Sequence, residues 1–196
     1  LPNYRRSMLG IYAIHNHDFN QDWAFNLGIR SDFAEMQIDE FYDPLLFEFL
    51  INRNNSIETA TNFATRSQNT SREFSNLNVL AGAKHQLNKN IDLGLTLGTN
   101  FRLPSAIELS ANGIHHGSFR HEQGDPNLSP ERGLVIDAKA SYVKPNYTIS
   151  LSPYLYYFSN YIFLNPSGIF SPLPHGGQIY RFTESEAIMA GFEFFY

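Results

Sequence analysis

The 196-residue chain contains no cysteine, which excludes disulfide bonds, zinc–thiolate sites and a thiol nucleophile. It has no apolar run approaching the roughly 20 residues that a membrane-spanning helix needs. Its 14 Lys and Arg residues are scattered and the net charge is −5, so the sequence has no basic patch for nucleic acid. The sequence also lacks a Gly-x-Ser-x-Gly turn, a His-Glu-x-x-His motif and a phosphate-binding loop. We therefore expect neither an enzyme nor a nucleic-acid-binding protein.

Charge is also scarce, and aromatic side chains are abundant. Charged residues make up 17% of the chain, against roughly 25% in soluble domains, while aromatic residues make up 15%. The mean hydropathy is nevertheless only −0.31. This combination favours an all-β protein whose strands have one apolar and one polar face, either soluble or a membrane barrel with a polar lumen. The chain begins with Leu1-Pro2 and shows no signal peptide, so we expect a processed chain or a fragment.

Apolar and polar residues alternate with period two through much of the sequence. Between Ile91 and Leu103, the odd positions are apolar or Thr, and the even positions are Asp, Gly, Thr, Asn and Arg. Because successive side chains of a strand point to opposite faces, this pattern predicts strands with one apolar face. The predicted strands are residues 5–17, 21–34, 73–87, 91–103, 132–143, 146–162 and 178–196. Many reach the roughly 9–11 residues of a tilted strand that spans a bilayer.

Short and long connections between these strands alternate. Short turns are expected around residues 19–21, 88–90 and 144–146, and long loops around 35–72, 104–131 and 163–177. Successive connections of an antiparallel meander lie at opposite ends, so all the long loops would gather at one end. Outer-membrane barrels have this asymmetry, with short periplasmic turns and long extracellular loops. The pattern therefore favours a membrane barrel over a soluble β-sandwich.

An odd number of strands does not form the usual even-numbered bacterial barrel. An open sheet in lipid would also leave backbone groups of its edge strands without hydrogen-bond partners. We therefore expect an all-β, antiparallel, up-and-down transmembrane β-barrel, present as an arc of seven strands from a larger barrel.

The segment from Phe101 to Arg132 carries several motifs in a fixed order. They are Arg102-Leu103-Pro104-Ser105, Glu108-Leu109, Gly113-Ile114-His115, Glu122-Gln123-Gly124-Asp125-Pro126-Asn127-Leu128 and Pro130-Glu131. Together they resemble the TonB-dependent outer-membrane receptors, although Asp125 stands where that family more often has Asn. Two other segments fit the resemblance, at Gly28-Ile29-Arg30-Ser31-Asp32 and at Gly191-Phe192-Glu193.

The resemblance implies a fold, a location and a function. Receptors of this family are barrels of about 22 strands in the Gram-negative outer membrane. An N-terminal plug fills the barrel, and an inner-membrane TonB complex energises the import of metal chelates and cofactors. Residues 1–196 would be part of one such multi-pass barrel domain, without its plug and closing strands. The implied partners are membrane lipid, that plug, the remaining strands and TonB. No cofactor is expected, and the transported ligand would be an iron–siderophore, haem or a similar scarce nutrient.

Local signals in the same segment predict an ordered loop. Ser105 and Glu108 have capping-box spacing, so Ser105 is expected to cap a short helical turn that runs through Leu109. Asn112-Gly113 would stop the turn through a left-handed glycine. Arg102 and Glu131 would pair across the base of the loop. We expect a structural role for the motif residues Arg102, Pro104, Glu108, Gly124, Pro126, Leu128 and Glu131.

The only cluster with metal-ligand chemistry lies in this loop and consists of His115, His116, His121 and Glu122. Neutral imidazole binds iron, copper and zinc, and haem takes an axial histidine. Haem receptors of the resembled family have a histidine between a Phe-Arg-Ala-Pro box and an Asn-Pro-Asn-Leu box. Phe101–Pro104 and Asp125–Leu128 are variants of these boxes. A contact to haem or a metal chelate is one interpretation, and ordinary loop polarity is the other.

Two further segments are candidates for contact with a ligand. The apolar run Phe41–Ile51 is expected to form a short helix at the barrel mouth, either packed within its loop or open to a hydrophobic ligand or partner. The residues expected on one face of this helix are Leu45, Leu46, Phe49 and Leu50. Tyr154 and Tyr156 fall on the predicted lumen face, where they would line a ligand path or pack against the plug.

Two other function classes remain open from the sequence. One is an unplugged porin or an adhesive outer-membrane barrel. The other is a secreted β-sandwich that binds carbohydrate through exposed Tyr and Phe side chains. A requirement for detergent separates the barrels from the sandwich.

Overall fold

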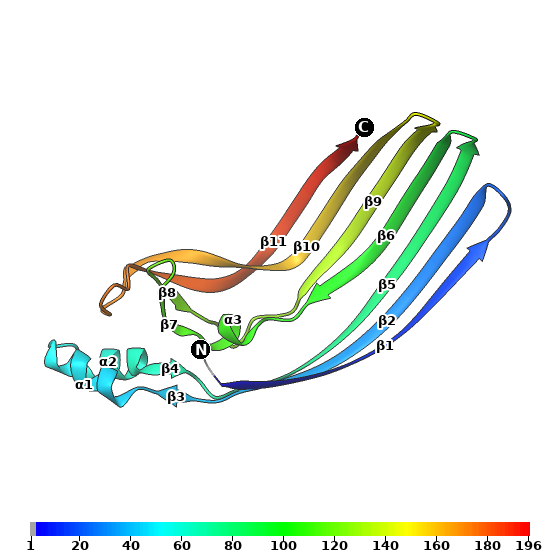
Figure 1. The fold of residues 1–196 in the computed structure, drawn as a ribbon. Coiled ribbons are helices and arrows are strands. Elements are labelled where there is room, and N and C mark those ends of the chain that lie inside the picture. The colour runs from blue at the N-terminus through cyan, green and yellow to red at the C-terminus, as the bar shows by residue number, and fades with distance from the viewer. Residues whose placement is uncertain (1–2) are drawn as a thin grey trace.

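The computed structural model describes residues 3–196, which form one large curved sheet with smaller elements at one end (Figure 1). The long strands are β1 (Tyr4–Asp18), β2 (Trp23–Ile38), β5 (Thr70–Asn88), β6 (Ile91–Arg102), β9 (Glu131–Lys144), β10 (Tyr147–Phe170) and β11 (Gln178–Phe195). The smaller elements are β3 (Phe41–Tyr42), α1 (Pro44–Asn52), α2 (Ile57–Ala64), β4 (Thr65–Ser67), α3 (Ala106–Ser110), β7 (Asn112–His115) and β8 (Arg120–Gln123). No helix within residues 3–196 is long and apolar enough to cross a membrane.

The long strands form an antiparallel meander, which confirms the predicted all-β class and the positions of its strands. Their order is β1-β2-β5-β6-β9-β10-β11, and β8 and β7 extend the sheet beyond β11. The β8–β11 pair is parallel, and the other pairs of this sheet are antiparallel. The sheet curves into an arc without closing on itself, so it has the form of part of a barrel (Figure 1).

The two faces of the sheet differ in polarity, as the alternation predicts. On one face, called the outer face here, Leu27 and Leu95 are exposed, and apolar side chains continue across neighbouring strands. On the opposite, inner face, Arg30 Nη2 lies 2.6 Å from Oδ1 of the buried Asp32. An apolar outer face with a polar inner face is the pattern of a barrel that meets lipid on its outside.

The short connections lie at the end of the sheet opposite the helices, as predicted (Figure 1). Asn20 Oδ1 accepts hydrogen bonds from the backbone N–H groups of Asp22 and Trp23, at 2.9 and 2.8 Å. Asn88 Oδ1 accepts from the N–H groups two and three residues further on, at 2.9 and 3.1 Å. These side chains replace missing backbone partners in the turns, which is why asparagine suits them.

The three long connections gather at the other end, but the third is shorter than predicted. β10 continues to Phe170, past the predicted end at residue 162, and only residues 171–177 connect it to β11. The pairing of β10 with β11 shifts register between Phe158 and Tyr161 and again between Pro166 and Phe170, and it resumes after each shift. A bulge places an extra residue in one strand without ending the ladder, so the turn-like residues near Pro166 do not stop β10.

The first long connection contains α1 and α2, each with a side-chain cap. Asp43 and Ser56 accept hydrogen bonds from the backbone N–H three residues on, at 3.0 and 3.1 Å. Helix α1 confirms the helix expected within Phe41–Ile51. Leu46, Phe49 and Leu50 pack in one apolar cluster, whereas Leu45 is 77% exposed, so the prediction of one shared face is wrong for Leu45.

The second long connection contains α3, which begins with the predicted capping box. Ser105 Oγ accepts from the Glu108 N–H at 3.2 Å, and Glu108 Oε2 accepts from the Ser105 N–H at 2.7 Å. The helix ends at Ser110, and Ala111 is already extended. The prediction of a left-handed glycine cap at Gly113 is therefore wrong, because Gly113 is part of β7.

This second connection folds back over the inner face of the sheet. Its apolar residues pack there against side chains of β2, β5 and β10 in a cluster called the inner core. The inner core consists of Met36, Ile38, Phe74, Leu103, Ala106, Leu109, Leu128 and Ile162. Full burial of each large apolar side chain contributes about 1.5–3 kcal/mol, so the inner core holds the loop in place over the barrel interior.

Candidate functional site

A charged clamp fixes the base of the second long loop. Arg102 Nε and Nη2 donate to the two carboxylate oxygens of Glu131, both at 2.8 Å, which confirms the expected pair. Arg102 Nη1 donates to Glu108 Oε2 at 2.8 Å. Glu131 Oε1 also accepts from the backbone N–H of Ile162 at 2.8 Å. The clamp therefore joins β6, α3, β9 and β10.

The Asp125–Leu128 box forms a turn that is held from across the sheet. Asp125 Oδ1 accepts from the Asn127 N–H at 2.8 Å. Arg72 of β5 donates to the carbonyl oxygen of Pro126, and to that of Leu128 at 3.3 Å. The buried Leu128 side chain anchors the turn in the inner core.

Gly124 allows a close approach of two backbone segments. A Cβ atom there would lie 2.5 Å from the Ser110 nitrogen and 2.7 Å from the Leu109 carbonyl carbon. The Gly124 N–H donates to the Ala111 carbonyl at 2.6 Å. A side chain at this position would force the turn away from α3. Pro104 is buried as well. The structural role expected for the motif residues remains a prediction.

All three long connections meet in a second apolar cluster, called the three-loop core here. Its buried residues are Leu50, Ala60, Phe63, Leu173 and Ile179, from α1, α2, residues 171–177 and β11. Ile114 of β7 packs against the cluster from the second connection. The smaller elements lie at one end of the sheet, called the loop end here (Figure 1), and the three-loop core joins them into one packed assembly.

His121 lies fully buried at the centre of this assembly and contacts all three connections. Its Nδ1 is 2.8 Å from Ser171 Oγ, and its Nε2 is 2.8 Å from Asn112 Oδ1. The imidazole ring of His121 packs edge-to-face against the Phe63 ring, with the ring centroids 5.3 Å apart. Burial, together with the positive charge of Arg66, lowers the pKa of His121 to about 4. The imidazole is therefore neutral at neutral pH.

Hydrogen bonding assigns the tautomer of His121. Asn112 Nδ2 donates to the carbonyl oxygens of Asn62 and Thr65, at 2.7 and 2.8 Å, so its Oδ1 must act as an acceptor. His121 Nε2 then carries the proton and donates to that oxygen, and Nδ1 accepts from the Ser171 hydroxyl. Both ring nitrogens are thus occupied by protein partners.

The other members of the predicted ligand cluster do not converge on His121. Glu122 follows His121 in β8 and so points to the opposite face of the strand, where its Oε1 accepts from Arg120 Nε at 2.8 Å. His115 and His116 are exposed. Within residues 3–196, no group of three or more His, Asp or Glu side chains is placed to hold a metal ion. Ligand binding by this set remains a prediction, and His115 and His116 are the members with accessible rings.

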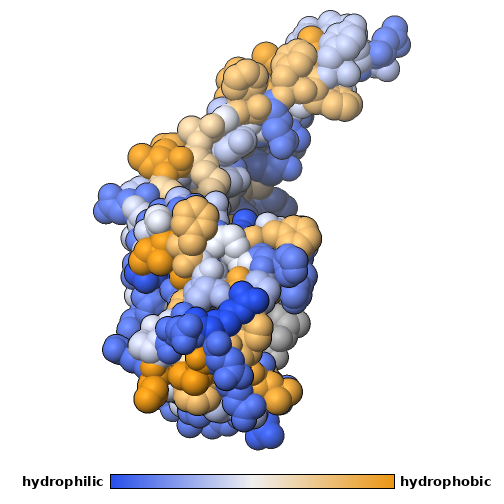
Figure 2. Space-filling view, turned by 90° about the vertical axis from the view of Figure 1, so that its left-hand side faces the viewer, coloured by the Kyte–Doolittle hydropathy of each residue, from blue (hydrophilic) through white to orange (hydrophobic). Residues whose placement is uncertain are grey.

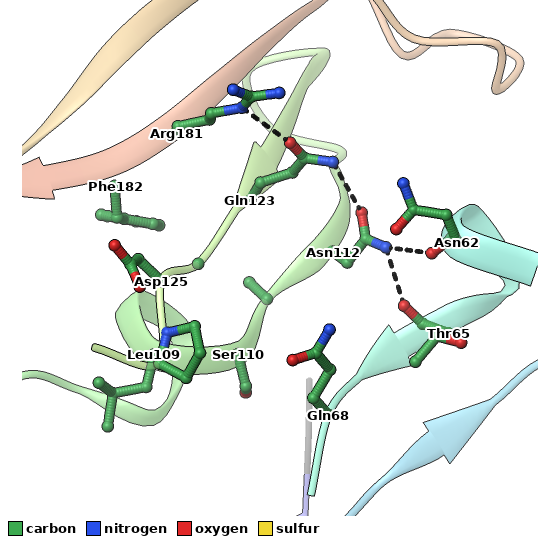
Figure 3. Close-up of a pocket in the computed structure, with 13 residues that line it drawn as sticks. Asn62, Thr65, Gln68, Leu109, Ser110, Asn112, Gln123, Asp125, Arg181 and Phe182 are labelled. Atoms are coloured by element: carbon green, nitrogen blue, oxygen red, sulfur yellow. Dashed lines mark hydrogen bonds between the residues drawn. The ribbon is translucent and has the colours of Figure 1, made fainter. Parts of the chain in front are cut away.

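A polar pocket of about 350 Å³ opens between the first two connections and β11 (Figure 3). Arg181 Nε donates to Gln123 Oε1 at 3.2 Å, and Gln123 Nε2 donates to Asn112 Oδ1 at 3.4 Å. We call it the amide pocket, because its polar lining consists largely of Asn62, Gln68, Asn112, Gln123, Asp125 and Arg181. Amide and guanidinium groups at a pocket wall suit a polar ligand rich in oxygen atoms.

The surface at the loop end is mixed in polarity. Figure 2 shows hydrophobic side chains there in separate patches among polar ones. Exposed apolar residues there include Phe41, Ile57 and Phe119 of the connections and Phe170 at the end of β10.

Comparison with known protein families identifies the barrel. Residues 1–196 match the model of the family described as TonB dependent receptor-like, beta-barrel. The chain belongs to this family. The resemblance noted in the sequence is therefore confirmed, and the family is made up of transport receptors. No curated protein matches the sequence.

Solved receptor structures have a similar fold. A double mutant of the Serratia marcescens haemophore receptor HasR, in complex with its haemophore HasA and haem, aligns over 96% of this chain and 31% of its own, with 16% identity and a TM-score of 0.70. The copper transporter OprC aligns over 95% and 26%, with 15% identity and a TM-score of 0.69. The ferric-catecholate import receptor Fiu from E. coli K12 aligns over 98% and 25%, with 15% identity and a TM-score of 0.63. The chain thus spans between a quarter and a third of the length of these structures.

In this receptor barrel, Tyr154 and Tyr156 lie on the inner face of β10, as expected. Tyr156 Oη donates to Asp137 Oδ1 at 3.0 Å, and the two tyrosine rings are 5.1 Å apart. Gly191 stands opposite Tyr154, and its lack of a side chain makes room for that ring. Whether they contact a ligand or a plug remains a prediction.

Sequence reasoning missed Asn112, Ser171 and the amide pocket of the receptor barrel. In the β7–β8 hairpin Asn112 pairs with Gln123 and His121 with Ile114, so Asn112 and His121 are diagonal neighbours, and Ser171 is brought in by the third connection. A period-two reading of Asn112-x-Ile114 and His121-x-Gln123 is the one local signal that would have indicated this hairpin.

Proposed function

We propose that the full receptor containing this chain imports a metal chelate, of the siderophore or haem class, across the outer membrane of a Gram-negative bacterium. The observation that carries the proposal is the joining of all three long connections into one assembly at a single end of a curved, lipid-compatible sheet. In this scheme the ligand approaches the loop end, and polar side chains of the connections hold it above the barrel interior.

Import in this scheme needs no chemical step from the chain. The plug and the inner-membrane TonB complex supply the conformational work, and the residues of this chain bind and orient the ligand. The amide pocket offers amide and guanidinium donors to ligand oxygens. His115 and His116 offer accessible imidazoles to a ferric centre or to haem. Tyr154 and Tyr156 lie further along the inner face, on the route inward or against the plug.

Uptake by the full-length receptor tests the proposal. The receptor is expressed in a Gram-negative strain without its own siderophore and haem receptors, and growth is measured under iron limitation. Haem, a ferric catecholate, a ferric hydroxamate and ferric citrate are supplied separately, with functional or deleted TonB. We expect growth with at least one of them, and only with functional TonB. Growth that persists without TonB would indicate an unplugged porin, and no growth with any of them would refute import of this ligand class.

A pair of variants tests the histidines. His115→Ala with His116→Ala removes both accessible rings, and His175→Asn is the matched control, because His175 is an exposed loop histidine with a φ of 61° that asparagine tolerates. If the rings contact the ligand, the double variant weakens binding of the imported chelate and the control does not. Equal affinity in both variants would remove the two histidines from the binding site.

A further inference from the structure

Arg66 of β4 reaches a second, smaller pocket on the other side of Asn112. This pocket has a volume of about 190 Å³, and Arg66 is partly buried in it. Phe41, Ile107 and Ile114 form apolar parts of the wall, and His115 and Glu122 lie at polar positions. Ala111 and Asn112 line both this pocket and the amide pocket, so the two share a wall.

The guanidinium of Arg66 makes no ion pair and no hydrogen bond within residues 3–196. Arg53 of the same connection also lacks such a partner, but Arg53 is exposed to solvent and Arg66 is partly buried. Arg72, Arg102, Arg120 and Arg181 each donate to a protein oxygen. A partly buried charge without a partner is costly, and burial lowers the pKa of Arg66. An anion in the pocket would compensate this charge.

The nearby carboxylates are already engaged. Glu122 accepts from Arg120 Nε at 2.8 Å, and Asp43 Oδ1 caps helix α1 through the Leu46 N–H at 3.0 Å. Asp43 acts on Arg66 through its charge without forming an ion pair with it. The pocket therefore holds a cation whose donors face no protein acceptor.

Gly113 keeps the space that the guanidinium occupies. A Cβ atom at this position would collide with the Arg66 guanidinium carbon and nitrogens. The Gly113 backbone is not in a left-handed conformation, so the glycine is required by this contact and not by a turn. The absence of a side chain at Gly113 thus leaves the space that the Arg66 guanidinium fills.

We propose that Arg66 binds a carboxylate group of the transported ligand, with Phe41, Ile107 and Ile114 against the carbon skeleton that bears it. A guanidinium presents paired N–H donors that match the two oxygens of a carboxylate. This inference rests on the proposed import function and narrows it to chelates that carry carboxylates, such as haem or hydroxycarboxylate complexes of iron.

The test compares ligands with and without free carboxylates on the full-length receptor in detergent. Intrinsic fluorescence quenching gives the Kd for haemin and haemin dimethyl ester, and for ferric citrate and a neutral ferric trihydroxamate. We expect the wild type to prefer at least one carboxylate-bearing probe over its counterpart. Arg66→Gln should weaken binding of that probe about 10- to 100-fold and leave the counterpart unchanged. Arg66→Lys should recover part of the loss, because it restores the charge without the paired donors.

Arg53→Gln is the matched control, because Arg53 lies in the same connection and stacks over the Phe49 ring at 4.7 Å outside the pocket. It should bind all four probes like the wild type. Thermal unfolding of each variant checks its folding, and if Arg66→Gln does not fold, the selectivity of Arg66→Lys decides.

Three outcomes would overturn the inference. They are no carboxylate preference in the wild type, an equal change for both members of a probe pair in the Arg66 variants, and destabilisation of the ligand-free receptor with unchanged selectivity. The last outcome would mean that a carboxylate from another part of the protein pairs with Arg66. Failure of the import proposal is distinguishable from these, because it would appear as absence of TonB-dependent uptake by the wild type.

Discussion

The sheet has two regions that are stabilised in different ways. One is the span, which is the part formed by the paired long strands between the short turns and the long connections, and the other is the loop end. In the span, the strands are held by long ladders of backbone pairs, and the outer side chains are exposed. At the loop end, both apolar clusters are buried together with polar side chains, among them His121, Glu122 and Glu131. Asp32 is the buried polar residue that lies apart from them, within β2. The span therefore depends on pattern, and the loop end depends on particular residues.

This difference follows from the surroundings of each region. Lipid solvates the apolar face of a barrel, so a strand in the span needs only alternation and paired backbone groups. The loops have no such ladder, and they need capped helices, ion pairs and buried hydrogen bonds to hold one conformation. Single substitutions should therefore have large effects at the loop end and small effects in the span.

The largest effect is expected for Glu131→Ala, which removes the acceptor of the clamp. Arg102 loses its bidentate partner but keeps Glu108 and contact with solvent, since its side chain is 44% exposed. The Ile162 N–H also loses its acceptor, and together these losses should lower the free energy of unfolding by about 2–4 kcal/mol. The change is measured by urea unfolding of the full receptor in lipid, with the loss of heat-modifiable gel mobility as the readout of unfolding. Glu73→Ala on the exposed part of β5 is the control and should stay within about 0.5 kcal/mol of the wild type. A loss at Glu131 as small as at Glu73 would contradict the clamp.

The next effect in size is expected at low pH, which should destabilise the loop end. The pKa of His121 is lowered to about 4 from an ordinary value of 6.5, so the packed state disfavours the protonated ring. The stability from neutral His121 is complete above pH 6.5 and is lost as the pH falls toward 4, by about 3 kcal/mol at the limit. Limited proteolysis of the loops between pH 7.5 and 4.5 should show rising cleavage in the wild type. A His121→Gln receptor cannot be protonated there and should lose this pH dependence, and a wild-type profile in the variant would refute the assignment.

A smaller effect is expected for Gly124→Ala. The added Cβ would press on the backbone of α3 at Leu109 and Ser110, which should cost about 1–3 kcal/mol of stability. Gly94→Ala, in the span, is the matched control, because its Cβ would meet only Lys139 Cβ at 3.9 Å. Urea unfolding of both variants compares the two regions directly. Equal stabilities would mean that the turn can move away from α3 at no cost.

The smallest effect is expected for Tyr156→Phe on the inner face of the span. The variant loses one hydrogen bond to Asp137, which is exposed enough to be solvated instead, so the change should be about 1 kcal/mol or less. The same unfolding measurement applies. A loss comparable to that of Glu131→Ala would show that the span also depends on particular residues.

The same contrast decides what the sequence could predict. Period-two alternation placed β5 at residues 73–87, close to the observed Thr70–Asn88. This was possible because the polarity of each residue in a strand indicates the face on which its side chain lies. The capping box at Ser105 was also readable, because its two hydrogen bonds join residues three apart. The end of β10 was not, since bulges let a strand pass turn-like residues such as Pro166.

The candidate site was only partly readable, because its contacts join distant parts of the chain. Arg102 and Glu131 were recognised through the family motif and through their places at the two strand ends. The histidines looked like one ligand cluster, yet His121 is buried and turned away from Glu122, because neighbours in a strand face opposite sides. Its contacts to Asn112 and Ser171 depend on how three loops pack, which no local pattern encodes.

Hydrogen–deuterium exchange on the full-length receptor tests most directly whether the three connections form one assembly. Wild type and His121→Ala are compared at pH 7.5, and exchange is followed in peptides covering α1 and α2, β7 and β8, and residues 171–177. The central His121 joins all three, so the variant should lose protection in all three groups of peptides together, while β5 and β6 in the span stay unchanged. Loss of protection in β7 and β8 alone would contradict a single loop assembly.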